Sequence, residues 1–496
     1  MPTHQRDKIA LCVPGSQRIQ IGPIIHLPLA LLSLAAWLRA YGNYDGRIKV
    51  LDANVRKLTA SDFSDAVIVG ITAMTGNQIR YGLEIAALAK AAHPDTVIVW
   101  GGIHSSLLPE QTVRHPLVDL VVIGEGEQTF MEVVDAVFRG DHLAGIPGTC
   151  CKDPIGNIVF GPSRPFINLG RLPKPAYDLI AIDDYPGSTH QFDYQSSRGC
   201  PFRCGFCYNT VFCGRRYRKK PSMQVVEELI TLHDRYRISG FGLVDDEFFI
   251  DRKRAEAIFD GIIESGRRFN LVASCRLDIV CGFPQALLAK MKLAGVTQML
   301  FGAESGSGAI LKYIKKDITR QHILEGARRV AESGIRPILS FMSGFPGETL
   351  NDFNRTLDTI RQLWALHPLI TVNGIFPFNA YPGTFLYDKA LTMGLKAPQT
   401  LEDWGAWSFQ YQPNNPWLDP TMKRHMEIAF YMIRFIYYIA RYEDRYPAGR
   451  LYIKLLKLGT WPLAASVHIR IRRRWFGNAL EWKLFARLVR KTFGYL

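Results

Sequence analysis

Two series of short apolar strand patterns that alternate with amphipathic helical patterns run through most of this chain, and they constrain its fold more than any other feature. Such alternation is typical of a parallel sheet with helices on its faces. Residues 1–145 carry the first series and are predicted to form a doubly wound α/β domain. Its strands are expected at Lys8–Val13, Arg47–Asp52, Ala66–Thr72, Thr96–Trp100 and Leu117–Ile123, and its helices at Leu27–Tyr41, Ile79–Ala92 and Gln128–Phe138.

The second series consists of six successive strand–helix units in residues 191–390. This predicts a partial (β/α)6 barrel of the TIM-like kind, which puts its chemistry on the loops after the strands. The strands are expected at Asp193–Ser197, Gly240–Val244, Asn270–Cys275, Gln298–Gly302, Arg336–Met342 and Ile370–Pro377. The helices are expected at Met223–Arg237, Arg252–Ser265, Pro284–Ala294, Arg320–Ser333 and Leu350–Leu366.

Two further parts of the chain lack this alternation. Residues 146–190 are rich in Pro and Gly and are expected to be a linker that lies against its neighbours, while residues 391–496 are expected to form a small helical region. The apolar stretch 24–37 contains His26 and Pro28 and is too short to span a membrane, so a buried amphipathic helix is predicted. With no secretory signal visible and an odd number of cysteines, nine, we expect a reducing, cytoplasmic location.

The formal net charge of +15 is concentrated at the end of the chain. Residues 421–496 contain sixteen Lys and Arg against four Asp and Glu, a net of +12, which leaves +3 for the rest. Because these basic residues alternate with Trp, Phe and Tyr at near-helical spacing, two interpretations stand. The region is either a bundle on the barrel with a solvated basic face, or a surface for peripheral contact with an anionic membrane at its cytoplasmic side. No module that stacks bases is recognisable, so nucleic acid is not an expected partner.

Several strands of the first series end in Gly-rich turns, "VPGS", "GITAMTGN", "WGGIHSS" and "VIGEGEQ". In a doubly wound sheet these turns share the edge formed by the carboxyl ends of the strands, where ligands bind. The turns therefore favour a ligand site at that edge over a purely structural use of glycine.

The stretch "SSRGCPFRCGFCYN" follows the first strand of the second series and holds Cys200, Cys204 and Cys207. Thiolates at such spacing bind either zinc or an iron–sulfur cluster. A closed zinc site needs a fourth ligand, and only Cys213 lies near, in a basic segment. The spacing favours a four-iron cluster, in which three thiolates leave one iron open.

The cysteine pattern, with Phe206 before its last member, resembles that of the radical S-adenosylmethionine (SAM) enzymes. "LVDDEFFID", "ASCRLD", "FGAESGSGAILKYIKKDIT", "FMSGFPGET" and "PFNAYPGTFLY" follow in the order typical of that family. Upstream, "LPLALLSLAAWLRAYG", "GITAMT", "WGGIHSSLLPE" and "VVIGEGE" resemble a Rossmann-like cobalamin-binding domain. Residues 8–390 together resemble the cobalamin-dependent radical SAM enzymes.

The resemblance implies that the three cysteines hold a [4Fe–4S] cluster whose open iron chelates SAM. Reductive cleavage of SAM then gives a 5′-deoxyadenosyl radical, which takes hydrogen from an unactivated carbon. Phe206 would border the adenine, and Asp245 and Asp246 would lie near the methionine amine. Glu304 would hold the ribose hydroxyls and Lys316 the methionine carboxylate. The same pocket would be lined by Ser274, Ser340 and Gly344.

The sequence departs from one cobalamin-binding pattern, because it lacks the Asp-x-His-x-x-Gly motif after the first strand. Cobalamin is therefore expected base-off, without a histidine ligand. The lower face of the corrin would meet Thr72, Met74 and Thr75, and the nucleotide tail would lie near Gly101, Gly102, Gly124 and Gly126. His104 is the only histidine of these loops, and a structural role is expected for it rather than ligation.

The family transforms its substrates in two main ways. One is methyl transfer to an unactivated carbon, here expected on an apolar or lipid-like small molecule because of the basic aromatic tail. The other is oxidative cyclisation or rearrangement, as in the anaerobic magnesium-protoporphyrin ester cyclase. Both need a reductant such as flavodoxin or ferredoxin. A non-catalytic cobalamin sensor would need no cysteine trio, and a methylthiotransferase would need three more clustered cysteines than the first domain has.

Overall fold

The first domain is built on a seven-stranded sheet with the order β2-β1-β3-β4-β5-β6-β7. The computed structural model describes residues 6–15, 26–185, 192–407, 415–445 and 450–493. The first five strands are parallel and have the doubly wound order, so the predicted fold of this domain is confirmed. The strands are β1 (Lys8–Val13), β2 (Ile48–Asp52), β3 (Ala66–Thr72), β4 (Val97–Gly101), β5 (Leu120–Val122), β6 (Thr149–Lys152) and β7 (Ile158–Phe160).

Helices cover both faces of this sheet, because side chains along the central strands alternate between two apolar cores. Ile9 and Leu11 of β1 pack beneath α1 (Leu29–Gly42) and α5 (Glu127–Arg139). Ala10 and Cys12 belong to the opposite core with α2 (Asn77–Ala92). The short helices α3 (Ile103–Leu107) and α4 (Pro109–Arg114) follow β4.

The segment 146–190, expected as a linker, contributes β6 and β7 to the edge of this sheet as an antiparallel hairpin. Cys150 and Cys151 are buried there, and the Asp153 carboxylate accepts hydrogen bonds from the backbone N–H groups of Ile155 and Asn157 to close the turn. The strands are too short for their alternation to stand out from a Pro- and Gly-rich background. From there to residue 185 the chain forms three short 3-10 helices (Leu169–Arg171, Tyr177–Leu179 and Ile182–Asp184), with Ala176 in a core of the first domain and Tyr177 in the core of the second.

The second domain has a six-stranded parallel sheet with the sequential order β15-β14-β13-β12-β11-β8. This is an open partial barrel, as predicted. Its strands are β8 (Phe192–Tyr194), β11 (Gly240–Leu243), β12 (Asn270–Ser274), β13 (Val296–Glu304), β14 (Arg336–Ser343) and β15 (Thr371–Pro377). Its outer helices are α7 (Ser222–Tyr236), α8 (Arg252–Glu264), α9 (Leu277–Cys281), α10 (Gln285–Leu293), α11 (Gly308–Tyr313), α12 (Arg320–Glu332) and α13 (Leu350–Leu366).

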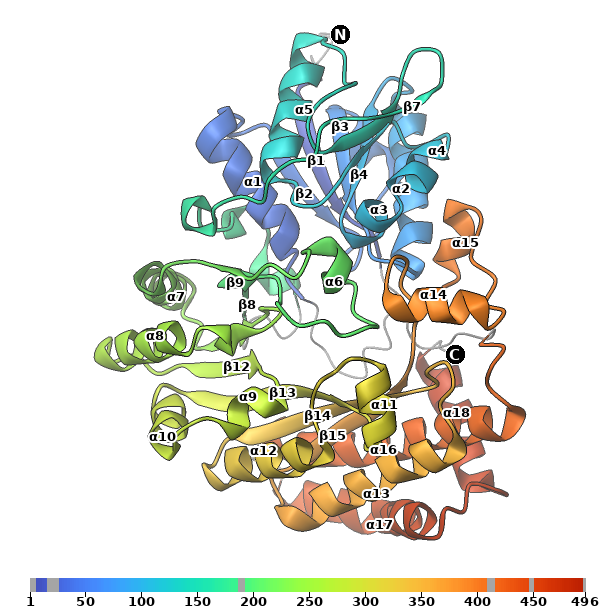
Figure 1. Ribbon diagram of the computed structural model, residues 1–496. Helices are drawn as coiled ribbons and strands as arrows, with labels where there is room; N and C mark the ends of the chain where they lie inside the picture. The colour runs from blue at the N-terminus through green and yellow to red at the C-terminus, as the bar shows by residue number, and fades with distance from the viewer. Residues whose placement is uncertain (1–5, 16–25, 186–191, 408–414, 446–449, 494–496) are drawn as a thin grey trace.

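The C-terminal region is helical, as predicted, but its parts lie against different domains (Figure 1). After α14 (Phe385–Thr392), α15 (Leu401–Gly405) packs against α2, and Trp404 enters the core of the first domain. The long helix α16 (Pro420–Arg445) instead packs on β15, the open edge of the barrel sheet. The last two helices, α17 (Arg450–Arg473) and α18 (Leu480–Phe493), pack on α16.

The two domains face each other with the loops after their strands at the junction (Figure 1). The short helix α6 (Asn209–Phe212), which follows the cysteine loop, contacts α3 of the first domain. Within the described residues, no helix is both long and apolar enough to cross a membrane.

Candidate functional site

A cavity of about 430 Å³ lies between the two domains at this junction. The first domain lines it with the ends of β3, β4 and β5 and with α1 and α5, and the second domain closes it with α6 and neighbouring loops. Three of the four predicted Gly-rich turns reach this cavity, while the turn after β1 continues into residues 16–25, outside the described part. The lining includes Leu11, Leu31, Leu34, Gly70, Thr72, Met74, Val99, Gly101, Gly102, Gly124, Gly126, Phe130, Tyr208, Asn209, Cys213 and Asp246.

Glycines make the wall of this cavity open to a ligand. A Cβ atom built at Gly124 would meet nothing within 4 Å, and one at Gly101 would meet only Val122 at 4.0 Å, so both face space that a bound group can fill. Gly102 has φ +89° and no room for a side chain, because its Cβ would lie 2.7 Å from the Thr72 hydroxyl oxygen. This apolar, glycine-lined cavity fits the nucleotide end of a corrinoid.

His104 and Thr75 lie behind the cavity wall rather than in it. The His104 ring is fully buried, its Nδ1 lies 3.0 Å from the Thr75 hydroxyl, and burial lowers its pKa to about 3. Its Nε2 has no hydrogen-bond partner among the described residues, and the ring meets Trp404 edge-on at 5.5 Å. A neutral, enclosed imidazole agrees with the structural role expected for it.

The cysteine loop is held on both sides by backbone hydrogen bonds. It runs from β9 (Ser197–Arg198) towards α6, and the antiparallel strand β10 (Arg218–Lys219) brings the chain back. The Gly205 N–H donates to the Ile314 carbonyl, and the Gly205 carbonyl accepts from Leu386 N–H. Gly199 has φ +85°, and any Cβ there would clash with the Arg216 carbonyl. The loop conformation is therefore fixed by its neighbours.

The three thiols are free, and those of Cys200 and Cys207 have raised pKa values. Burial, with smaller contributions from the neighbouring thiols, raises the pKa of Cys200 to about 11 and that of Cys207 to about 12. Cys204 has a cationic neighbour, since a guanidinium nitrogen of Arg276 lies 3.8 Å from its sulfur. The guanidinium places a positive charge beside a sulfur that would carry negative charge as an iron ligand.

No three His, Cys, Asp or Glu side chains in the described part of the chain converge on a point that one metal ion could occupy. Cys213, the candidate fourth ligand of a closed zinc site, lies on the cavity side, with its sulfur 3.4 Å from the Asn209 amide oxygen. A cluster of several irons needs no such convergence, because each thiolate binds its own iron. The donor set fits an iron–sulfur cluster.

The two aspartates after β11 hold the cysteine loop. The buried Asp245 carboxylate accepts hydrogen bonds from Ser196 N–H at 2.6 Å, from Ser197 N–H at 2.8 Å and from the Ser196 hydroxyl. Asp246 accepts from Gly199 N–H at 2.7 Å and from the Asn209 side chain. These partners differ from the methionine amine that the resemblance implies. Both oxygens of each carboxylate already accept hydrogen bonds, and Asp246 also lines the cavity.

Glu304 and Lys316 are brought together at the barrel mouth. Their side chains are buried and form an ion pair of 2.9 Å, although separate contacts to SAM are expected for them. A β-bulge at the end of β13 and a φ of +59° at Glu304 turn its carboxylate inward. Gly302 leaves room for the pair, because a Cβ there would lie 2.2 Å from a Glu304 carboxylate oxygen and 3.0 Å from Lys316 Nζ.

The other predicted SAM contacts also lie at strand ends around this mouth. Ser274 ends β12, Ser340 lies in β14 opposite Gly302, and Gly344 follows β14 with φ +89°. Phe206 is half-buried, with its ring 6.2 Å from that of Phe345. All of these roles remain predictions.

Arg276 and Glu348 are site residues that the sequence did not single out, although each lies within a quoted motif. Arg276 stacks on the Phe202 ring at 3.7 Å and donates to the Lys316 carbonyl at 2.7 Å, besides contacting Cys204. Glu348 accepts from the N–H groups of Gly344 and Phe345, and burial raises its pKa to about 7.

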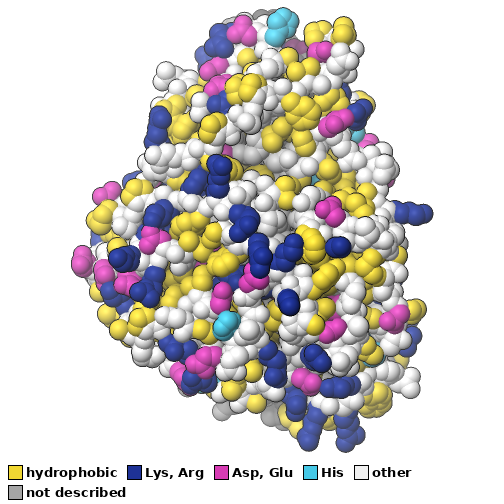
Figure 2. All heavy atoms as spheres, in the orientation of Figure 1, with side chains coloured by type: hydrophobic (Ala, Val, Ile, Leu, Met, Phe, Trp, Pro, Cys, Tyr) yellow, Lys and Arg dark blue, Asp and Glu magenta, His cyan; other side chains and the backbone are white. Residues whose placement is uncertain are grey.

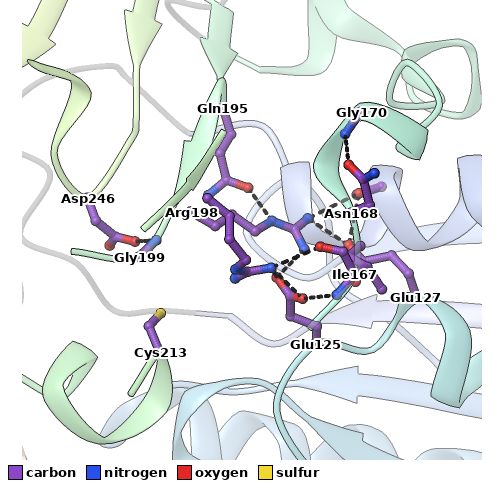
Figure 3. A network of polar contacts seen from close by, with 12 residues as sticks. Glu125, Glu127, Ile167, Asn168, Gly170, Gln195, Arg198, Gly199, Cys213 and Asp246 are labelled. Atoms are coloured by element: carbon purple, nitrogen blue, oxygen red, sulfur yellow. Dashed lines mark hydrogen bonds and ion pairs between the residues drawn. The ribbon is translucent and has the colours of Figure 1, made fainter. Parts of the chain in front are cut away.

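A buried ion network joins the two domains beside the cysteine loop (Figure 3). Arg198 of β9 donates to Glu125 at 3.0 Å and to Glu127 at 2.6 Å. Arg218 of β10 pairs with Glu125 at 2.8 Å, and the Ser33 hydroxyl donates to Glu127. Because both glutamates come from the "GEGE" turn, the network fixes the first domain relative to the chain that leads into Cys200. No sequence pattern predicts this partnership.

Comparisons with known proteins agree with this geometry. A model of the Radical SAM superfamily matches residues 194–360, and one of the B12 binding domain matches residues 22–134. The structure of the radical SAM methyltransferase TsrM from Kitasatospora setae, with tryptophan and a SAM analogue bound, aligns with a TM-score of 0.63. That alignment covers 78% of this chain and 76% of the other at 20% identity, which shows a shared fold.

Three curated relatives extend the comparison. An uncharacterized methyltransferase of Pyrococcus horikoshii is 35% identical over 74% of this chain and 79% of its own length. The anaerobic magnesium-protoporphyrin IX monomethyl ester cyclase of Rubrivivax gelatinosus is 27% identical, over 68% of this chain and 64% of its own. The hopanoid C-2 methylase of Rhodopseudomonas palustris is 27% identical, over 73% of this chain and 64% of its own length.

The glycine-lined cavity, the cysteine loop that faces it and these matches account for both halves of the molecule. The chain belongs to the cobalamin-dependent radical SAM enzymes.

Proposed function

We propose that the protein transfers a methyl group from SAM to an unactivated carbon of an apolar or lipid-like substrate. One observation carries this proposal: the glycine-lined cavity at the carboxyl edge of the first domain's sheet is closed on its other side by α6, the helix that follows the cysteine loop. A site for a methyl carrier and a site for radical formation therefore share one junction. When bound, the cofactors supply one-electron cleavage of SAM and methyl carriage.

The residues of this chain hold and orient those groups. Cys200, Cys204 and Cys207 would ligate the [4Fe–4S] cluster, and Arg276 would stabilise the thiolate of Cys204. The cavity wall would hold cobalamin base-off, with Thr72 and Met74 on its lower side. SAM would lie over the mouth that Phe206 and the Glu304–Lys316 pair share. A low-potential carrier such as flavodoxin or ferredoxin would supply the electrons.

Aromatic side chains around the cysteine loop support an apolar substrate. Phe345 lies between the rings of Phe206 and Phe378, and Tyr208 meets Tyr381 edge-on at 6.0 Å. Such walls exclude water from a reactive radical. A relative named as a hopanoid methylase agrees with a lipid-like substrate. The alternative is an oxidative cyclisation, because a ring-forming cyclase is equally similar in sequence.

The balance of products distinguishes these reactions. Methyl transfer converts one SAM to S-adenosylhomocysteine and cleaves a second to methionine and 5′-deoxyadenosine, with the removed substrate hydrogen in the latter. The test is anaerobic reconstitution with SAM, a reductant and a candidate polyprenoid lipid, followed by quantification of both nucleosides. Both products in comparable amounts support methylation, and 5′-deoxyadenosine alone supports the cyclase reaction.

The control variants separate an enzyme from a cobalamin sensor. Cys200→Ala should lose cluster iron and both products but keep cobalamin binding. Cys281→Ala is the matched control, because this thiol is half-buried, lies in α9 away from the cysteine loop and donates to the His322 carbonyl. If Cys200→Ala retained SAM cleavage, or if the protein bound zinc in place of iron and sulfide, the proposal would be overturned.

A further inference from the structure

The two last helices carry exposed apolar side chains along their outer faces. On α17, Trp461 and Ile469 are eight residues apart and therefore lie on one face, and they are 69% and 48% exposed. On α18, Leu480 and Leu484 are four residues apart and 66% and 54% exposed, and Trp475 in the intervening turn is 51% exposed. Exposed side chains of this size on adjacent helices mark an interaction surface.

The opposite faces of these helices are packed, so the outer faces are held in place. Phe435 of α16 meets Trp482 of α18 edge-on at 5.5 Å. Arg470 of α17 pairs with Glu481 of α18 at 2.6 Å, and the Ser466 hydroxyl donates to the same carboxylate. Both helices pack on α16, and α17 also packs on α13, so the exposed apolar residues of each helix lie on its solvent side.

The charges between these apolar residues are almost all positive. Residues 461–487 contain six Lys and Arg and a single acidic residue, Glu481, which Arg470 already neutralises. Arg472, Arg473, Lys483 and Arg487 are exposed, and Arg474 pairs with Asp358 of α13. Figure 2 shows Lys and Arg side chains gathered at the lower end of the molecule, where α17 lies in Figure 1.

We infer that the outer face of α17 and α18 binds the surface of an anionic lipid bilayer. Trp and Leu side chains would enter the interface while the arginines pair with lipid phosphates, as in helices that lie flat on membranes. Since no described helix can span a bilayer, the contact is peripheral. The inference rests on the proposed function, because membrane contact would give the enzyme access to a lipid-like substrate in the bilayer.

The test is co-flotation of the full-length purified protein with vesicles of phosphatidylcholine and phosphatidylglycerol in equal parts, compared with phosphatidylcholine alone. We expect binding to the anionic vesicles only, weakened by salt. Arg472→Glu with Arg473→Glu should reduce the partition coefficient by well over tenfold, since each basic residue contributes about fivefold before the added repulsion. Trp475→Ser with Leu480→Ser should also reduce it at least about tenfold.

The matched control replaces exposed apolar residues elsewhere, as Ile155→Ser with Leu293→Ser, which are 84% and 73% exposed. This variant should float like the wild type, and unchanged circular dichroism and melting temperature will show that every variant is folded. The inference fails if the wild type does not float, if the tail variants float as well as the wild type, or if the control variant loses binding equally. Tighter binding to a single-stranded oligonucleotide than to vesicles would also overturn it. No step of this assay involves turnover, so its failure leaves the proposed reaction untouched.

Discussion

Replacement of Arg198 by methionine should test whether the buried network holds the two domains together. The substitution removes the bonds to Glu125 and Glu127 but keeps the apolar part of the side chain. The Glu127 side chain is only 4% exposed and would retain the Ser33 hydroxyl at 3.2 Å and its own backbone N–H, with no cation beside it. Removing one partner of a buried ion pair leaves an uncompensated charge and typically costs about 3–5 kcal/mol.

The assay is urea-induced unfolding followed by circular dichroism, with two companion variants. Glu127→Gln in the Arg198→Met background removes the stranded charge, so it should recover more than half of the lost stability. Arg203→Met, in the same loop, loses only an exposed pair with Asp317 and should change stability little. If Arg203→Met cost as much as Arg198→Met, or if Glu127→Gln gave no recovery, the argument would be refuted.

The contribution of the same ion network to stability should depend on pH. Burial alone would raise the pKa of Glu127, but the charge and hydrogen bonds of Arg198 outweigh burial and lower it. A carboxyl with a lowered pKa in the folded state stabilises the protein above its unfolded pKa of about 4.3, and this contribution is lost as the pH falls through the folded value. The stability difference between wild type and Arg198→Met should therefore be largest near neutral pH and shrink below about pH 4.

Three further predictions concern the cofactor sites. Arg276→Met should lower the iron and sulfide content of anaerobically purified protein, because Cys204 loses the cation beside its sulfur, and Arg276→Lys should restore part of it. Gly101→Leu should weaken cobalamin binding at least about tenfold in a spectrophotometric titration without a change in melting temperature, because the new side chain fills the cavity; unchanged affinity would place the corrinoid elsewhere. His104→Gln should leave the electron paramagnetic resonance spectrum of the bound Co(II) form unchanged, without nitrogen splitting, since the imidazole is fully buried behind the cavity wall with its Nδ1 beside the Thr75 hydroxyl.

The periodic features of the chain were predictable because they arise from local burial. Both parallel sheets and the Gly-rich edge were expected at nearly the observed residues, since strands buried on both faces and tight turns leave a local mark. The hairpin of β6 and β7 was not expected, because its strands of four and three residues are too short for a readable alternation. The contact of Trp404 with the first domain was not expected either, because its partner Gln111 lies 293 positions earlier in the chain and no local pattern links the two.

The sequence alone determined three local features: three thiols at fixed spacing, glycines in the turns that border the cavity, and basic aromatic helices at the end. Spacing along one loop or one helix is a local property, so it can be read directly. Only the tertiary structure decided which charges meet. Glu304 pairs with Lys316, Arg198 bridges to Glu125 and Glu127, and both Asp245 and Asp246 hold the cysteine loop. A buried charge needs a partner, but packing between distant segments selects that partner, and no local pattern records the choice.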